Sequence, residues 1–509
     1  MLLFWPIVIP LLTAVFTLLA WRSTEMQRGI SITGAVALLI SSIQIFSDVQ
    51  QVGPISAQSG GWIAPYGITL VADTLSAVML LLTGVVGVAI VIFSTTDVSR
   101  EEEHFGFHPL THSVLTGICG AFLTGDIFNL YVWFEVMLIA TFGLLVIGGG
   151  KAQFDGAVKY VGLNLIATVA IIAGVGLLYG TTGSLNMADL HGLLEGRSGE
   201  AVVLASGAFL FFAFGSKAAL FPVNFWLPAS YHTPSATTSA LFAALLTKVG
   251  VYSILRIFTL VYDVEGTIFV PLFFLAALST MFFGAMGTLS QNNVFRLLGF
   301  SIIASVGFMM LGLAIGTPLA LAGAAFYLFQ DVLAKAGLFL GAGAAARLTG
   351  SELFARSGGI WKARIGFSLL FLIPALSLAG VPPLAGFWAK LLLVQAALEV
   401  NGYFLTLAIL GTGFLLLYAM GRVWAAVFWS PHPAGDRAIQ ERLGATSILP
   451  LLSISILIIF IGVYAGTFVT IALEVGQELT DPSAYVEAVL GGAEASGGEM
   501  ESVEPEVKE

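Results

Sequence analysis

The chain alternates long apolar runs with short polar connections along almost its whole length. A run of about 20 apolar residues is long enough to cross a lipid bilayer as a helix. Helices suit this solvent because they satisfy their own backbone hydrogen bonds. The pattern therefore predicts an all-α polytopic membrane protein with about 14 transmembrane helices, at residues 2–21, 29–47, 70–94, 107–124, 127–148, 157–180, 201–223, 235–262, 267–289, 294–316, 318–346, 364–398, 403–429 and 446–473.

Two of the predicted helices, the seventh and the twelfth, contain or adjoin prolines. Proline lacks a backbone N–H and its ring clashes with the preceding turn, so it kinks or ends a helix. We therefore expect both helices to be broken. The prolines concerned are Pro222 in the seventh helix, Pro234 directly before the eighth, and Pro382 and Pro383 in the twelfth.

The spans also divide into two similar units of five helices. Each unit has an odd number of spans, so the second would be inverted with respect to the first, a repeat typical of transporters. Broken helices seven and twelve are the fourth helix of each unit. The expected boundaries are 1–106 for helices one to three, 107–262 for the first repeat (helices 4–8), 263–430 for the second repeat (helices 9–13), 431–479 for helix fourteen and 480–509 for an acidic disordered tail.

Composition and charge agree with this organisation. Hydrophobic residues make up 58% of the chain and charged residues 10%, against roughly 25% charged in soluble domains. The net charge of −10 comes largely from the C-terminus, since ten acidic residues and one basic residue follow from Glu474 onward. The remainder is nearly balanced, which argues against nucleic-acid binding. A single cysteine, Cys119, excludes an intrachain disulfide.

Basic residues in the connections predict the orientation, because lysine and arginine favour the cytoplasmic side. The first apolar run lacks a basic start and a cleavage site, so we expect it to be retained as the first span. One set of alternate connections holds eleven basic residues and the other holds Arg197 and Lys508. Both termini are therefore expected outside the cytoplasm, in a prokaryotic cell membrane. The eleven residues are Arg22, Arg28, Arg100, Lys151, Arg296, Arg347, Arg356, Lys362, Arg364, Arg437 and Arg442.

Five ionisable residues lie well inside predicted spans: Glu135, Lys217, Lys248, Lys335 and Lys390. A charge at the bilayer centre costs about 3 kcal/mol on insertion scales. All five would cost on the order of 15 kcal/mol if they faced lipid unpaired, as much as the stability of many domains. We therefore expect them to face a common polar interior.

The chemistry that such residues permit is proton relay. Burial lowers the pKa of a lysine and a nearby carboxylate raises it, so a movable carboxylate switches a lysine between holding and releasing a proton. We expect Glu135 to act in this way on one of the four lysines. The sequence contains no phosphate-binding glycine loop, metal-ligand spacing or activated nucleophile, so we expect no cofactor, metal or catalytic residue.

Simpler interpretations stay open for several of these side chains. Lys217, Lys248 and Lys390 could extend toward the headgroups, and Glu135 could be a static partner of one lysine. Lys335 could pair locally with Asp331, four residues earlier on the same helix face. His232 is either an ordinary loop histidine or a proton uptake point, and Asp126 is a further candidate. Near a helix end, Arg256 is expected to anchor its helix.

Three stretches carry a family resemblance: GDIFNLYVWFEVMLIATFGLLV at 125–146, KAALFPVNFWLPASYHTPSATTSALFAALLTKVGVYSILR at 217–256, and GVPPLAGFWAKLLL at 380–393. They resemble the proton-translocating antiporter family, which comprises the antiporter-like subunits of respiratory complex I and of multisubunit Mrp-type sodium/proton antiporters. The resemblance runs from about Pro65 to Trp429. It implies fourteen helices, inverted five-helix repeats and broken helices seven and twelve.

Carried over by motif position, the resemblance assigns relay roles to Glu135, Lys217, Lys248, Lys335 and Lys390. The chain departs from the complex I members at two positions, where histidines are replaced by Tyr327 and Asp331. This departure puts a histidine link in doubt, makes Asp331 a candidate substitute and favours the Mrp branch. The stretches GDIFNLYVWFEVML at 125–138 and GWIAPYGITLVADTLSAVML at 61–80 resemble the D subunits of that branch in particular.

The resemblance therefore implies an integral subunit of a monovalent cation/proton antiporter, a secondary transporter and not an enzyme. Its implied partners are other subunits of the complex, protons, sodium or another monovalent cation, and membrane lipids. Two alternatives stay open: a proton-pumping subunit of a complex I-type dehydrogenase or membrane hydrogenase, and a non-transporting scaffold with structural charge pairs.

Overall fold

The computed structural model describes residues 2–435, 439 and 443–500, with side chains described as far as residue 491. Within these residues, twelve helical stretches are long and apolar enough to cross a membrane. They are formed by η1 (Leu2–Phe4) with α1 (Trp5–Leu19), α2 (Thr24–Val52), α3 (Thr74–Asp97), α6 (Ile127–Val146), α7 (Lys151–Thr182), α9 (Ala201–Ala218), α11 (Ala236–Leu241) with η3 (Phe242–Leu246) and α12 (Thr247–Leu260), α13 (Phe269–Ser290), α14 (Val294–Ile315), α15 (Pro318–Thr349), α19 (Tyr403–Val423) with η5 (Trp424–Trp429), and α20 (Ala445–Val463).

The other elements are shorter. The helix α5 (Phe107–Leu123) and the pair α17 (Ile365–Ala379) and α18 (Ala385–Glu399) occupy the predicted fourth and twelfth spans, so the count of fourteen stays a prediction. The remaining elements are β1 (Ile55–Gln58), η2 (Ser59–Gly61), β2 (Thr69–Ala72), α4 (Arg100–His104), α8 (Met187–Leu193), α10 (Trp226–Ser230), η4 (Phe354–Arg356), α16 (Ile360–Ala363), α21 (Ala465–Thr480) and α22 (Ser483–Met500).

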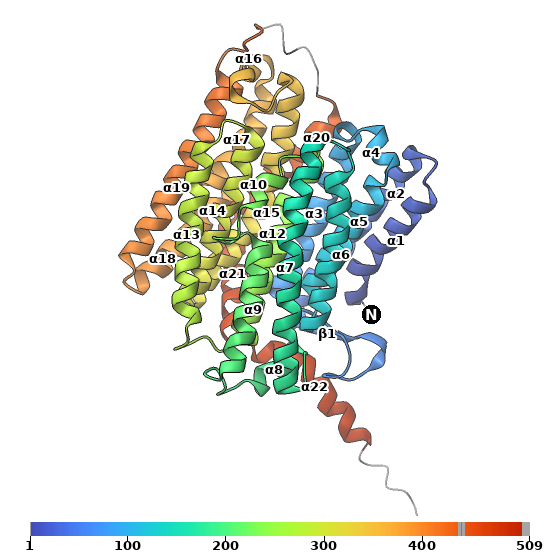
Figure 1. Ribbon diagram of the computed structural model, residues 1–509, viewed down its shortest axis with the longest axis vertical. Coiled ribbons are helices and arrows are strands. Elements are labelled where there is room, and N and C mark those ends of the chain that lie inside the picture. The colour runs from blue at the N-terminus through green and yellow to red at the C-terminus, as the bar shows by residue number, and fades with distance from the viewer. Residues whose placement is uncertain (1, 436–438, 440–442, 501–509) are drawn as a thin grey trace, which may run out of the picture.

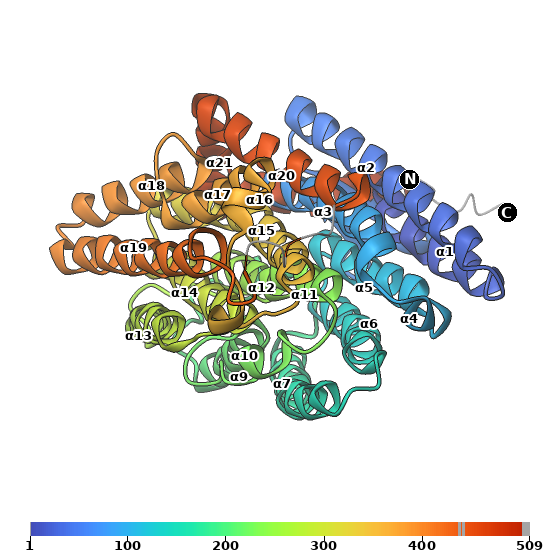
Figure 2. The ribbon, with the colours of Figure 1, turned by 90° about the horizontal axis from the view of Figure 1, so that it is seen from above.

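The helices run along the long axis of the molecule (Figure 1). Seen from above, α12 and α15 lie inside a ring formed by the others (Figure 2). Their most apolar stretches are 100% and 94% buried, against 39% for those of α1, α2 and α20. Lysines on α12 and α15 are therefore shielded from lipid by the protein itself.

Both predicted helix breaks are confirmed. The helix α9 ends at Ala218, and Ala219 then adopts the left-handed conformation, with φ of 62°. The helix α17 ends at Ala379, and Gly380 adopts the same conformation, with φ of 86°. A proline follows each of these caps three residues later, Pro222 in one case and Pro383 in the other. The matching order of features agrees with a repeat, although the inverted relation itself stays a prediction.

The two ends of the molecule differ. The start of α1 and the helix α22 lie at one end, and α4 and α16 lie at the other (Figure 1). At the first end, β1 and β2 form an antiparallel hairpin with Ile55 opposite Ala72. An even number of crossings places the termini together, as expected. Which end faces the cytoplasm stays a prediction.

The expectation of disorder from residue 480 onward is wrong for the first part of that tail. The helix α22 begins at Ser483, and its Tyr485 and Val489 side chains are buried. Ser56 on β1 donates a hydrogen bond to the Ala488 carbonyl at 2.6 Å. Two side chains four residues apart share one face of a helix, and this face packs α22 against the rest of the protein. Residues 501–509 lie outside the described residues.

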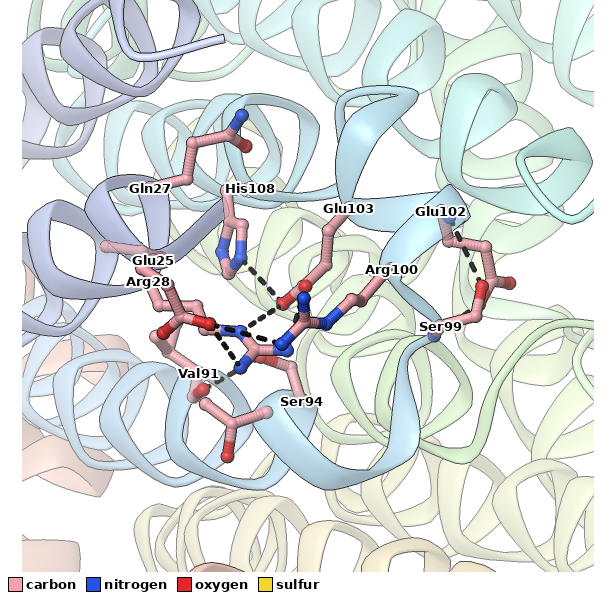
Figure 3. A network of polar contacts seen from close by, with 12 residues as sticks. Glu25, Gln27, Arg28, Val91, Ser94, Ser99, Arg100, Glu102, Glu103 and His108 are labelled. Carbon is pink, nitrogen blue, oxygen red and sulfur yellow. Dashed lines mark hydrogen bonds and ion pairs between the residues drawn. The ribbon is translucent and has the colours of Figure 1, made fainter. Parts of the chain in front are cut away.

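A buried ionic network fastens the short helix α4 at the opposite end (Figure 3). Arg28 on α2 donates two hydrogen bonds to Glu103, at 2.8 and 2.9 Å, and His108 lies 3.3 Å from the same carboxylate. Burial opposes ionisation of Glu103, but its bonds with His108 and Arg28 lower its pKa below the ordinary value. Deeper along α5, His112 bonds to Ser31 at 2.7 Å. Sequence analysis named Arg28 only as a basic residue of a connection, and it did not single out Glu103, His108 or His112.

Candidate functional site

A carboxylate flanked by two lysines lies at the centre of the bundle. The Nζ atom of Lys248 is 2.7 Å from Oδ2 of Asp331, and that of Lys335 is 3.6 Å from Oδ1. All three side chains are fully buried. The expected local pair between Asp331 and Lys335 therefore exists, but the shorter contact joins Asp331 to Lys248 on a different helix. The trio carries one net positive charge when all three groups are ionised.

The surrounding backbone and side chains satisfy these charges. The π-helical turn η3 ends just before α12 begins, and Lys248 donates to the Ala243 carbonyl in this turn at 2.8 Å. Such π turns disturb the regular hydrogen-bond ladder and are frequent at functional sites. On α14, Ser305 donates to Asp331 and Lys335 donates to Ser301, each at 2.8 Å. Buried charges are tolerated where they are paired and hydrogen-bonded in this way.

The two serines were missed by sequence analysis. Ser301 and Ser305 are four residues apart in the apolar run GFSIIASVGF. Polar residues at that spacing share one helix face. This spacing, in a span whose one other polar side chain is Arg296 near its start, was the signal that could have identified them.

Lys217 lies at the end of α9, just before the break, and is buried. Its Nζ atom is 4.7 Å from the centre of the Phe134 ring, a cation–π distance. No ion pair within 4.0 Å joins it to Glu135 in the described part of the chain. Lys217 instead adjoins a cavity of about 20 Å³ that is also lined by Tyr160 and Tyr231.

Glu135 does not face a common polar interior, so that expectation is wrong for this residue. It is only half-buried, and its Oε1 atom accepts a hydrogen bond from Thr168 on α7 at 2.6 Å. The physical reason is its position on the helix. Glu135 shares the outward stripe of α6, a face that recurs every three to four residues, with exposed Phe128, Val132, Ile139 and Phe142.

Lys390 lies on α18, after the break in the twelfth span. It donates to the carbonyls of Leu378 and Ala379, at 2.9 and 2.7 Å, which are the last carbonyls of α17. These orphan groups carry the negative end of a helix dipole, so they suit an ammonium group. Its Nζ atom is also 5.4 Å from the centre of the Phe308 ring.

Lys217 and Lys390 are thus not at matched positions of the two breaks. Lys217 precedes the left-handed residue Ala219 by two positions, whereas Lys390 follows Gly380 by ten. The prediction that each broken helix carries a buried lysine is confirmed. The lysines approach their breaks from opposite sides, one before the interruption and the other after it.

The secondary candidates have local partners. Asp126 caps α6 by accepting from the Asn129 amide at 2.7 Å, and burial raises the pKa of its carboxyl. His232 accepts from Nε of Arg296 at 3.2 Å. Burial and the adjacent Arg296 charge lower the pKa of His232 to about 4, so its ring is neutral at neutral pH. This geometry favours the loop interpretation of His232 over proton uptake.

Arg256 does not anchor its helix at a headgroup, contrary to expectation. It is buried, and its Nη2 atom is 2.6 Å from Oδ2 of Asp73, at the start of α3. The guanidinium also lies 5.0 Å from the ring of Tyr485 on α22. Sequence analysis could not place Arg256 because its partners lie on two distant helices.

Together, these contacts form three separate groups of ionisable residues. The central group is Lys248, Asp331 and Lys335. Outside it, Lys217 contacts Phe134 and Glu135 bonds to Thr168. Lys390 contacts Phe308. Lysine and carboxylate side chains such as these can each bind and release a proton. In the described ranges, no cluster of three or more His, Cys, Asp or Glu side chains could hold a metal ion.

Comparison with known proteins identifies the family. The family model described as NADH:quinone oxidoreductase/Mrp antiporter, TM, matches residues 124–415, more than half of the chain. The D subunit of the Na(+)/H(+) antiporter of Alkalihalophilus pseudofirmus is 40% identical over 486 residues, which cover 95% of this chain and 98% of the relative. The chain therefore belongs to the NADH:quinone oxidoreductase/Mrp antiporter family. All five relay candidates fall within the part that the Mrp antiporter family model matches.

Solved structures agree with this assignment. A chain of the Mrp complex from Dietzia sp. DQ12-45-1b matches with a TM-score of 0.89 and 28% identity, covering 96% of this chain and 99% of that one. A chain of the membrane-bound sulfane sulfur reductase, an archaeal respiratory membrane complex, matches with a TM-score of 0.88 and 29% identity, covering 95% and 99%. The fold of the Mrp antiporter family therefore occurs in antiporters and in respiratory complexes alike.

Proposed function

We propose that this protein is the D subunit of a multisubunit Na+/H+ antiporter in a prokaryotic cell membrane. In this proposal it conducts protons along Glu135, Lys217, Lys248, Lys335 and Lys390, and their flow is coupled to sodium export by the whole complex. The observation that carries the proposal is the buried Lys248–Asp331–Lys335 group, in which one carboxylate contacts two ammonium groups. A structural pair would need only one lysine.

The central group can pass a proton without moving a helix. Asp331 can pair with either lysine. When one lysine loses its proton, the pairing of Asp331 with the other lysine becomes stronger. Ser301 and Ser305 hold Lys335 and Asp331 in place for such a transfer through hydrogen bonds of 2.8 Å. Because the nearby charges interact strongly in a buried setting, each proton position biases the next.

In this proposal, Lys217 and Lys390 extend the path beyond the central group. The aromatic rings beside them, Phe134 and Phe308, stabilise a cation without holding a proton acceptor. A proton reaches or leaves these lysines through water or a moving side chain. Lys217 and Lys390 therefore suit the ends of the path, where a lysine exchanges its proton in only one state of the protein.

A partner protein of the complex covers the outward face of Glu135 in this proposal. A half-buried carboxylate in the middle of a span would otherwise meet lipid, at a cost of about 3 kcal/mol. The relative from Alkalihalophilus pseudofirmus is named as one subunit of an antiporter, which supports an assembly of several chains.

Both termini of this chain lie outside the cytoplasm in the proposed arrangement.

The test is sodium-dependent collapse of a pH gradient in membrane vesicles that contain the whole complex. Lys248→Met and Glu135→Ala are each expected to abolish it at unchanged assembly. Undiminished collapse in Glu135→Ala would remove Glu135 from the path. If charge-neutral variants lower only assembly, and turnover per assembled complex is unchanged, the protein is instead a scaffold.

The respiratory alternative has its own test, and the similarity to the sulfane sulfur reductase is the observation that motivates it. The chain would then copurify with iron–sulfur subunits and with flavin or nickel subunits. Copurification with other antiporter subunits alone supports the antiporter. The 40% identity with a named antiporter subunit favours that outcome.

A further inference from the structure

The carboxylate of Glu135 bonds to Thr168 in the structure, whereas the proposed relay pairs it with Lys217. Thr168, buried on α7, donates its hydroxyl to Glu135 at 2.6 Å. Lys217, on α9, is the ammonium group that the proposed relay pairs with the same carboxylate. The helix α7 packs against both α6 and α9, so Thr168 and Lys217 flank Glu135 from neighbouring helices.

Phe134 separates the two positions of the carboxylate. Successive residues on a helix point about 100° apart, and Phe134 faces Lys217 while Glu135 faces Thr168. The Phe134 ring is buried and stacks on Phe214 at 5.7 Å. Pairing with Lys217 therefore requires a Glu135 side-chain conformation different from the one that bonds to Thr168, so the two pairings are distinct states.

The environment of Lys217 in the observed state includes a small polar cavity. Its volume of about 20 Å³ is sufficient for one water molecule. Tyr231 lines it, and within the described residues the buried Tyr231 hydroxyl has no hydrogen-bond partner. Contacts of the Trp226 ring with the rings of Tyr160 and Tyr231, at 5.3 and 5.5 Å, hold this hydroxyl in position.

We propose that Thr168 is a positioning residue that holds Glu135 away from Lys217, and that Lys217 then passes its proton to a water molecule beside Tyr231. The inference rests on the proposed relay. In the transfer, one N–H bond of the Lys217 ammonium breaks and one O–H bond to the water forms. Lysine becomes neutral and the water carries the proton and the charge. When Glu135 returns to Lys217, the ion pair favours reprotonation.

The experiment uses the complete complex in vesicles, with Thr168→Val and Thr168→Ser as a matched pair. Valine keeps the shape and loses the hydroxyl, whereas serine keeps the hydroxyl. Thr168→Val is expected to lower sodium-dependent proton flux per assembled complex about tenfold, because a hydrogen bond to a charged group is lost. Thr168→Ser is expected to stay within about twofold of the parent, since it retains that bond.

A second measurement separates positioning from packing. In a structure of the Thr168→Val complex, the Glu135 carboxylate is expected within about 4 Å of Lys217 Nζ, the distance that defines an ion pair. If Thr168→Val does not assemble, Thr168→Ala removes the same hydroxyl with less bulk. Glu135 remaining apart from Lys217, or equal flux in the valine and serine variants, overturns the inference.

The outcomes also distinguish this inference from the relay itself. Loss of flux in Lys217→Met together with normal flux in Thr168→Val would reject the role of Thr168 and leave the proposed relay standing. Normal flux in Lys217→Met would reject the proposed relay, and the role of Thr168 would be rejected with it. Tyr231→Phe, which deletes only the cavity hydroxyl, is expected to lower flux while leaving the Glu135–Thr168 bond intact, and full flux in that variant overturns the water step.

Discussion

Asp331 on α15 and Lys248 on α12 form a fully buried ion pair at 2.7 Å, at the centre of the helical bundle. The same carboxylate lies 3.6 Å from Lys335, so a single acidic group serves two lysines. This relationship joins the two predicted repeats, because α12 belongs to the first and α15 to the second. It is the contact on which the proposed path depends most.

Replacing Asp331 by asparagine is expected to leave two buried ammonium groups without a counter-charge. Removal of one partner from a buried pair costs about 3–5 kcal/mol, so both the yield of assembled complex and the flux per complex should fall. The measurements are copurification of partner subunits and the vesicle assay. As a control, Asp155→Asn removes the partner of Lys159 in an exposed pair, which should change stability by less than about 1 kcal/mol. Equal effects of the two substitutions would contradict the central role of Asp331.

Replacing Glu103 by glutamine should destabilise the α2–α4–α5 end of the molecule. The change leaves Arg28 facing a neutral amide in a buried setting, at a cost of about 3 kcal/mol. Thermal unfolding of the purified complex, followed by limited proteolysis near α4, measures the effect. Glu200→Gln is the matched control because its bidentate partner Arg197 lies at the exposed surface. We expect proton flux per surviving complex to be unchanged, since the network lies outside the proposed path.

Replacing Gly380 by alanine should disturb Lys390 without touching its charge. The backbone there has φ of 86°, and an added Cβ would lie 2.8 Å from Cδ of Lys390. A non-glycine residue in this conformation costs about 1–3 kcal/mol, and the lysine must also shift from the α17 carbonyls. The control is Gly411→Ala on α19, where an added Cβ meets nothing within 4 Å. Reduced flux in the first variant and full flux in the second is the expected result.

His232 gives the protein a pH dependence with a defined sign. The pKa of its ring is lowered to about 4 in the folded protein, against about 6.5 for an unperturbed histidine. The unfolded chain therefore binds a proton first, and stability is fully present above about pH 6.5 and declines as the pH falls toward about 4. His232→Asn should reduce this decline between about pH 7 and pH 5 in thermal unfolding of the complex. An unchanged decline would mean that other groups dominate the acid response.

The apolar periodicity by itself determined much of this architecture. It placed most of the spans, and the prolines located both helix breaks, because these properties depend only on residues close together in the sequence. The same local reasoning identified each lysine inside a span, since an isolated charge in an apolar run is visible without knowledge of the neighbours.

Tertiary structure alone decided how the charges are paired. The sequence suggested Lys335 as the local partner of Asp331, yet the shorter contact is with Lys248, because α12 and α15 pack together at the centre. The sequence analysis placed Glu135 in the interior, whereas the orientation of α6 about its own axis turns the Glu135 side chain outward, toward Thr168. Arg256 was assigned to a surface that α3 and α22 in fact cover. Helix periodicity states which residues share a face, but the partner of that face depends on contacts between distant segments.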